Sequence, residues 1–383
     1  MSAAMLAGFY SVFIFGIIIA FLGSVKLKLT TRIDADDAQF GKIVSVLQWT
    51  MVVMAILAGL MLDSLGFRTI IILGAVLSAA AILYFGQSRT VTSVMIACVV
   101  LGIAGQFVNV AGNTLNPMLF DDLSAGSNLG NSFFGLGALL IPVIAAALFS
   151  RMKYATSMVV IAAICLPAVL LALLGDFPAT GGQSFSASVA LSLLGNHITW
   201  LAALTLFCYI GLEVSMAVWI TTYATELGAS ETKAAQTLSL FFVAMMIGRL
   251  IVGLQDQVTG ISLTPIGGHI LSVAALIAAV AITMMMKSGS LGSARLAVIL
   301  AGLVFAPIFP TTIGVVFQHF DEAQRGTLFG VIFAIGLIGA STIPAWIGSL
   351  AKDGSVKSGL NILRITAIAL AVIAALLGAA PLF

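Results

Sequence analysis

The chain has 383 residues, of which 61% are hydrophobic and only 8% charged, and its formal net charge is +2. An average soluble domain carries roughly 25% charged residues, so this composition excludes a soluble globular fold. The small net charge gives no support for a nucleic-acid partner.

Apolar stretches without charges follow one another along the chain, and a bilayer core about 30 Å thick needs about 20 apolar residues per helix. The breaks between these stretches predict two sets of membrane helices. The predicted spans are 5–25, 42–62, 69–87, 92–118, 129–150 and 156–175, then 197–225, 234–255, 265–286, 293–319, 326–349 and 361–381. The runs do not alternate polar and apolar residues, which excludes a membrane-spanning strand barrel. The first stretch lacks the basic region of a signal peptide and is expected to be a retained helix.

The longest irregular stretch, residues 176–196, separates the two sets. The sequence therefore predicts an all-α polytopic membrane protein, with about twelve transmembrane helices in two pseudo-symmetric six-helix bundles. The expected bundles are 1–175 and 197–383, joined by the linker 176–196. Transporters built from such repeats bind solute near the membrane midplane, at the interface of the repeats. A solute transporter is the expected function.

A polar turn follows the second predicted helix. Gly59, Asp63, Gly66 and Arg68 have the spacing of a glycine, an acid, a second glycine and a closing basic residue. This pattern resembles the signature of the major facilitator superfamily, although Ser64 replaces the usual basic residue. Asp63 could lie against the positive end of another helix and pair with a basic neighbour, while Gly59 permits close helix approach. These four residues are therefore predicted to form a conformational latch.

About 190 residues later, Gly248-Arg249 and Gly253-Leu-Gln-Asp256 look like a decayed copy of this turn, so Arg249 is assigned to the latch. In the resembled superfamily the first turn is cytoplasmic, which places both chain ends inside. That assignment leaves all but three of the 16 Lys and Arg residues outside, against the positive-inside rule. For the orientation in the membrane, the motif is favoured over the count of Lys and Arg. A reporter that is active on only one side of the membrane, fused to either terminus, would determine this orientation.

The fourth predicted helix carries four carboxamides at spacings of three, four and three residues: Gln106, Asn109, Asn113 and Asn116. This spacing makes one polar stripe along the helix. Four amides facing lipid would be prohibitive, so the stripe must face a partner helix or a wet cavity. Amides donate and accept hydrogen bonds, which suits a polyhydroxylated ligand, but hydrogen bonds between helices explain them as well.

Glu213 lies near the middle of the seventh predicted helix, where an ionisable group is costly and therefore a functional candidate. It is the predicted site of the coupling ion, able to take up and release a proton during transport. The alternative is a structural acid that bonds a neighbouring helix. Arg249 is expected to lie too near a helix end to pair with it. Further candidates for solute binding are Gln48, Asn131, Tyr209, Trp219 and Tyr223.

Three segments resemble the fucose:proton symporter branch of the superfamily: Asn113-Thr-Leu-Asn116-Pro117, Asn131-Ser-Phe-Phe-Gly135-Leu-Gly137, and Gly211-Leu-Glu213 with Trp219 and Tyr223. The resemblance implies a hexose or deoxyhexose as the solute, driven by a cation gradient. That branch uses acids in its first and fourth helices, which this chain lacks. Coupling could therefore fall to Glu213, sodium could replace the proton, or transport could be uncoupled.

Two other functions stay open. An exporting antiporter of the same superfamily normally has a Gly-Pro pair in its fifth helix, and this chain has Gly137-Ala-Leu-Leu-Ile-Pro142 instead. A non-transporting sensor on the same fold is the second. Neither paired catalytic groups nor a metal-ligand spacing is present, so no enzyme, cofactor or metal is predicted. The expected location is the bacterial inner membrane, where the protein is expected to be a monomer in the lipid bilayer. Its three cysteines are expected to be buried and unpaired.

Overall fold

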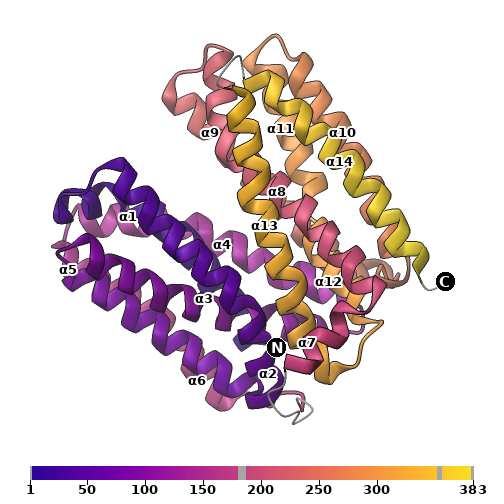
Figure 1. The fold of residues 1–383 in the computed structure, drawn as a ribbon, viewed down its shortest axis with the longest axis horizontal. Helices are drawn as coiled ribbons and strands as arrows, with labels where there is room; N and C mark the ends of the chain where they lie inside the picture. The colour runs from indigo at the N-terminus through magenta and orange to yellow at the C-terminus, as the bar shows by residue number, and fades with distance from the viewer. Residues whose placement is uncertain (1, 180–186, 352–355, 381–383) are drawn as a thin grey trace. The chain divides into compact units, whose positions relative to one another are not determined.

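The structure is a computed structural model and describes residues 2–179, 187–351 and 356–380, in which the regular elements are all helical (Figure 1). The first half contains α1 (Ala3–Ile33), α2 (Asp37–Gln87), α3 (Val91–Met118), α4 (Leu123–Phe149), α5 (Tyr154–Cys165), α6 (Pro167–Leu174) and α7 (Ala187–Leu194). The second half contains α8 (His197–Glu226), α9 (Glu231–Thr259), η1 (Thr264–Ile266), α10 (Gly267–Lys287), α11 (Leu291–Phe305), α12 (Ile308–Phe317), η2 (Glu322–Gln324), α13 (Arg325–Ala351) and α14 (Val356–Ala379).

Eleven helical segments of the described chain are long and apolar enough to cross a membrane. The longest, 38–87, covers two of the predicted spans. The predicted fold class is therefore confirmed, and the chain is an integral membrane protein.

The predicted turn at 59–68 is not a separate loop, because α2 continues through it. Only Gly66 leaves the helical conformation, with φ 81° and ψ 164°. A side chain would be strained at this positive φ, so the glycine allows a sharp kink between the two spans without an open loop.

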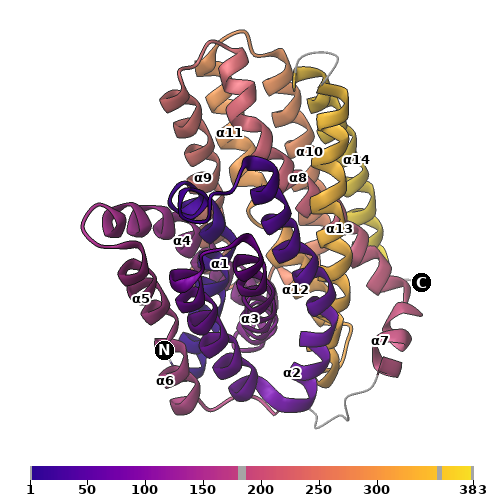
Figure 2. The same cartoon turned by 60° about the vertical axis from the view of Figure 1, so that its left-hand side comes forward.

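Proline explains two further differences from the predicted spans. The predicted helix 156–175 is divided at Leu166, before Pro167, into α5 and α6 (Figure 2). The predicted helix 293–319 is likewise divided into α11 and α12 at Pro307. A proline removes one backbone donor and clashes with the preceding turn, so each helix breaks there.

The predicted linker 176–196 contains the short helix α7, at 187–194. Residues 180–186 of the linker and residue 381 of the last predicted span lie outside the described residues. The fifth predicted helix begins earlier than expected, since Asp122 caps α4 at Leu123. The three cysteines are buried and unpaired, as expected.

The chain forms two compact units, and each contains a short segment from the other half of the sequence. Unit 1 comprises Met1–Leu119, Phe133–Ala190 and Asp321–Gly330, and unit 2 comprises Phe120–Ser132, Leu191–Phe320 and Val331–Phe383. The division into six-helix bundles on either side of 176–196 stays a prediction.

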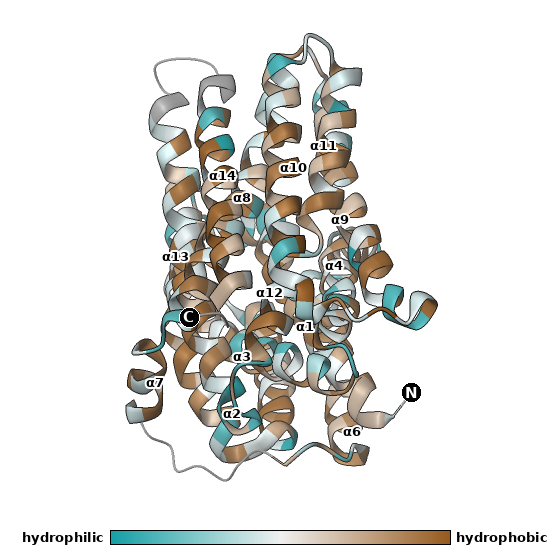
Figure 3. Ribbon diagram, turned by 90° about the vertical axis from the view of Figure 1, so that its right-hand side faces the viewer, coloured by the Kyte–Doolittle hydropathy of each residue, from teal (hydrophilic) through white to brown (hydrophobic). Residues whose placement is uncertain are grey.

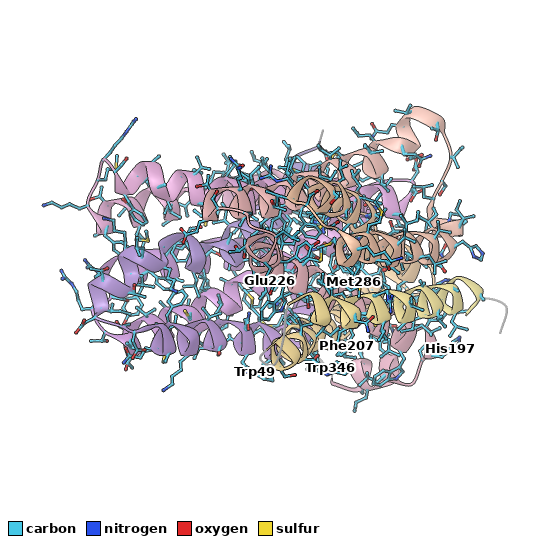
Figure 4. The ribbon with its side chains drawn as sticks, turned by 90° about the horizontal axis from the view of Figure 1, so that it is seen from above. Trp49, His197, Phe207, Glu226, Met286 and Trp346 are labelled. Atoms are coloured by element: carbon cyan, nitrogen blue, oxygen red, sulfur yellow. The ribbon has the colours of Figure 1, made fainter. Side chains whose placement is uncertain are left out.

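In unit 1, α3 packs between α1 and α2. In unit 2, α14 packs against α8 and α10, and Ser272 of α10 donates a hydrogen bond to the carbonyl of Ala371 at 2.9 Å. Apolar side chains also cover outward faces of the helices, as the hydropathy colouring of α10 and α11 shows in Figure 3. Among them, Trp49 and Trp346, labelled in Figure 4, are 64% and 61% exposed. Such faces are suited to contact with lipid rather than water.

Candidate functional site

A carboxylate, a guanidinium and a phenol meet in unit 2. The Glu213 Oε1 atom of α8 lies 3.8 Å from Arg249 Nη2 of α9, and the same nitrogen donates to the hydroxyl of Tyr209 at 3.2 Å. The Arg249 side chain is 3% exposed and that of Glu213 is 17% exposed. The expectation that Arg249 lies too far along its helix to pair with Glu213 is wrong. The assignment of Arg249 to the latch stays a prediction.

Two backbone carbonyls complete the surroundings of Arg249. Its Nε atom donates to the Ala306 carbonyl and its Nη1 atom to the Asn131 carbonyl, each at 3.3 Å. In a regular helix the amide of residue 310 would bond the carbonyl of residue 306. Pro310 has no amide hydrogen, so the Ala306 carbonyl is left for Arg249.

This arrangement holds Arg249 through neutral groups as well as through Glu213. A buried guanidinium needs acceptors for its donors, and two carbonyls and a phenol supply them. Glu213 is the partly accessible member of the pair. A proton or a cation could therefore bind at Glu213 and leave again while Arg249 keeps its other partners.

In unit 1 three of the four amides in the predicted stripe form a hydrogen-bonded ladder along α3. Asn113 Nδ2 donates to Asn109 Oδ1 at 2.8 Å, and Asn109 Nδ2 donates to Gln106 Oε1 at 3.1 Å. All the amides of the stripe are at most 1% exposed. Gln106 Nε2 and both polar atoms of the Asn116 side chain have no hydrogen-bond partner. Buried amide atoms without partners are unfavourable, so these atoms mark positions where a polar ligand or water would be stabilising.

The predicted latch residue Asp63 caps the first turn of α13 within unit 1. Its Oδ1 atom accepts from the Gly326 amide at 3.0 Å. Its Oδ2 atom accepts from the amide and hydroxyl of Thr327 at 2.8 and 2.6 Å. A Cβ at Gly59 would collide with the Gly326 carbonyl, so glycine is required for this close approach. Asp63 thus satisfies free amides at the positive end of a helix.

We expect Asp63→Asn to weaken the attachment of α13 to α2. An asparagine would present amide hydrogens to the donors at Gly326 and Thr327 and would lack the charge that favours a helix N-terminus. The expected loss of stability is about 1–3 kcal/mol, measured as a lower unfolding temperature of the purified protein. Asp256→Asn is the matched control, because Asp256 is partly exposed and its carboxylate makes no hydrogen bond within the described residues. Equal effects of the two changes would contradict a structural role for the Asp63 carboxylate.

The structure reveals an acidic cap in unit 2 that the sequence analysis missed. Asp122 Oδ1 accepts from the amides of Ser124 and Ala125 at 2.7 and 3.1 Å. The hydroxyl of Thr264 donates to the same oxygen at 2.5 Å, and the Leu263 amide and the Ser262 hydroxyl donate to Oδ2. Asp122 therefore joins the start of α4 to the turn that enters α10. The available signal was an acid directly before a long apolar run, which is the N-cap position of a helix.

The hydrogen bonds to Asp122 outweigh its burial. Burial by itself would raise the pKa of this carboxyl, but the bonds from Thr264, Ala125, Leu263 and Ser262 hold the pKa below its ordinary value. These donors stabilise the charged form, so Asp122 is an ionised structural group.

Two predicted residues of unit 2, Tyr223 and Trp219, make contacts outside the Glu213 group. The hydroxyl of Tyr223 donates to the Met285 carbonyl of α10 at 2.5 Å, which identifies a packing contact near the end of α8. Trp219 contacts Gly348 of α13, and its indole nitrogen has no partner. Arg68 donates to the Gly175 carbonyl at 3.0 Å and so braces the end of α6. In unit 1, Gln48 of α2 is exposed.

The described residues contain no group of three or more His, Cys, Asp or Glu that could hold a metal ion.

A family model described as the Major Facilitator Superfamily matches residues 4–344. A TsgA homolog from Erwinia tasmaniensis is 26% identical over 245 residues, which is 63% of this chain and 62% of that protein. Protein TsgA of Salmonella typhimurium is 30% identical over 175 residues, 44% of each chain. The matched region therefore spans less than two thirds of these relatives.

Two solved structures share the fold over nearly the whole chain. The fucose:proton symporter FucP of E. coli has a TM-score of 0.79 and 20% identity, covering 98% of both chains. The proton:xylose symporter XylE has a TM-score of 0.78 and 13% identity, covering 97% of this chain and 94% of its own. Identities this low show a common architecture, and the solute has to be argued from the side chains.

Proposed function

Because the chain belongs to the major facilitator superfamily, we propose that it is a secondary active transporter of a small polyhydroxylated solute, driven by a proton or sodium gradient. The solute class proposed is a sugar. The two solved structures of the same fold are named as sugar:proton symporters, which supports this choice. Alternating access across the bacterial inner membrane, with a monomer and both termini cytoplasmic, is part of the proposal.

The observation that carries the proposal is Glu213, a carboxylate within a membrane-spanning helix. It lies 3.8 Å from a guanidinium that has three other acceptors. The Glu213 side chain keeps 17% exposure beside Arg249, so it remains partly accessible to an ion. An acid of this kind is suited to bind and release the coupling ion.

The amide ladder of α3 supports a polyhydroxylated solute. Carboxamides both donate and accept, as sugar hydroxyls do. Gln106 Nε2 and the Asn116 amide have no hydrogen-bond partner, so hydroxyl groups of a solute would stabilise them. Tyr209 adds an aromatic ring in unit 2, beside Phe305 and Phe309.

We expect Asn113→Leu to weaken solute binding by about tenfold, which corresponds to the loss of one or two hydrogen bonds. The change removes one end of the ladder, because Asn113 donates to Asn109. Binding is measured by the thermal shift that a bound solute produces. Asn361→Leu of α14 is the matched control and should leave the affinity unchanged. A normal affinity in Asn113→Leu would remove the ladder from the solute site.

The function is tested by a thermal-shift screen of sugars, nucleosides and amino acids with and without sodium. A stabilising sugar is then assayed for uptake into liposomes under an imposed proton or sodium gradient. Uptake that follows one gradient supports the proposal and identifies the ion. Lower accumulation of fluorescent dyes in cells that contain the protein would favour an exporter. Liposomes that move no solute under any gradient would favour a sensor.

A further inference from the structure

A groove on the outer face of unit 2 has the shape and charge of a lipid site. It has a volume of about 670 Å³ and lies on α10, α11 and α14. Its lining includes Leu276, Val280, Thr283, Met284, Lys287 and Arg364. Figure 1 shows α10 and α14 side by side along this face.

The apolar part of the groove faces away from the protein interior. Leu276 is 51% exposed, Val280 is 56% exposed and Met284 is 44% exposed. On the α14 wall Ile368 is 46% exposed. These side chains belong to membrane-spanning helices, so the groove opens toward the acyl chains of the bilayer.

Two cations stand at different depths in this groove. Lys287 is in the last turn of α10, near the membrane boundary. The Ser272–Ala371 hydrogen bond fixes the level of α14 against α10. Lys287 follows Ser272 by about 22 Å and Arg364 precedes Ala371 by about 10 Å along the helix axes, at 1.5 Å per residue, so Arg364 lies about 12 Å, or roughly two turns, deeper than Lys287.

No acid offsets these charges. The groove lining contains no Asp or Glu. Neither Lys287 nor Arg364 makes an ion pair or hydrogen bond in the part of the chain that the structure describes. A guanidinium at this depth is costly without an anion. The long Arg364 side chain is able to lie along the apolar wall and carry its charge toward the polar end of the groove.

We propose that this groove binds one anionic phospholipid of the phosphatidylglycerol class. Its phosphate lies between Lys287 and Arg364, and an acyl chain follows Val280, Leu276 and Ile368 along α10 and α14. Charge complementarity selects this occupant, because two cations and no acid line the polar end. A zwitterionic lipid would add a third cation there, and free phosphate would leave the apolar wall unfilled.

The test uses the purified, delipidated full-length protein titrated with fluorescent phosphatidylglycerol, fluorescent phosphatidylcholine and glycerol phosphate. Phosphatidylglycerol should bind more tightly than phosphatidylcholine, and glycerol phosphate should compete only weakly. Lys287→Gln and Arg364→Gln should each weaken phosphatidylglycerol binding by about fivefold. Val280→Trp, which fills the apolar part without changing charge, should also weaken it.

Lys233→Gln is the matched control, because Lys233 is an exposed cation of α9 and does not line the groove. It should bind phosphatidylglycerol like the unchanged protein. Lys287 lies at an exposed helix end, so Lys287→Gln should fold normally even if Arg364→Gln does not. Equal affinity for the two lipids, an unaffected Lys287→Gln, or full competition by glycerol phosphate would each overturn the proposal.

Discussion

Glu213→Gln is expected to abolish gradient-driven uptake while counterflow exchange of the solute continues. Glutamine keeps the size and polarity of the side chain but cannot take up or release a proton, and it offers a sodium ion no charge. Arg249 keeps its bonds to Ala306, Asn131 and Tyr209, so the surrounding helices should remain in place. The measurement compares uptake in liposomes with an imposed gradient against exchange of labelled solute without one.

The matched control for that experiment is Glu226→Gln. Glu226 is the last residue of the same helix, and Figure 4 shows it near Met286. Uptake by this variant should be normal. Unchanged active uptake in Glu213→Gln would remove Glu213 as the coupling acid. Loss of both uptake and exchange would assign Glu213 to solute binding instead.

Arg249→Met should be the most destabilising of these substitutions. It removes a buried cation and leaves the Glu213 carboxylate and three neutral acceptors without their donor. Removing one partner of a buried ion pair typically costs 3–5 kcal/mol, so we expect a loss of about that size. The measurement is the unfolding temperature of the purified protein in detergent.

Arg295→Met provides the comparison. Arg295 also makes several hydrogen bonds, to Thr237, Gln236 and the Lys233 carbonyl, but at a partly exposed helix end. Its loss should have a much smaller effect because water can replace those bonds. Combining Arg249→Met with Glu213→Gln should recover part of the stability, since no unpaired carboxylate then remains. A double variant no more stable than Arg249→Met would contradict an energetic link between the two side chains.

Composition was sufficient to predict the membrane helices, because apolar length is a direct consequence of bilayer thickness. The polar stripe of α3 was also predictable, since helical periodicity alone places Asn109 and Asn113 on one face. The positions at which helices are interrupted were less predictable. Proline at 167 and 307 interrupted helices, whereas Pro117, Pro142 and Pro344 lie inside continuous ones.

The surroundings of Glu213 were beyond the reach of the sequence. Arg249 and Asn131 are 118 residues apart, and the link between them runs through a backbone carbonyl that no side-chain pattern records. The Ala306 carbonyl became an acceptor only because Pro310 lacks a donor, which is visible once both helices are placed. Local motifs thus predicted the acid and missed its partner.

The continuous path of α2 through Gly66 bears on how the sidedness of the protein can be mapped. A reporter spliced between residues 59 and 68 would enter a kinked helix whose Gly59 and Asp63 pack on α13. Such an insertion would disturb the fold and report on a damaged molecule. The turn at Leu227–Ser230, between α8 and α9, is a better place for an inserted tag. Gly228 there has φ +82° and nothing within 4 Å of the position that a Cβ would occupy.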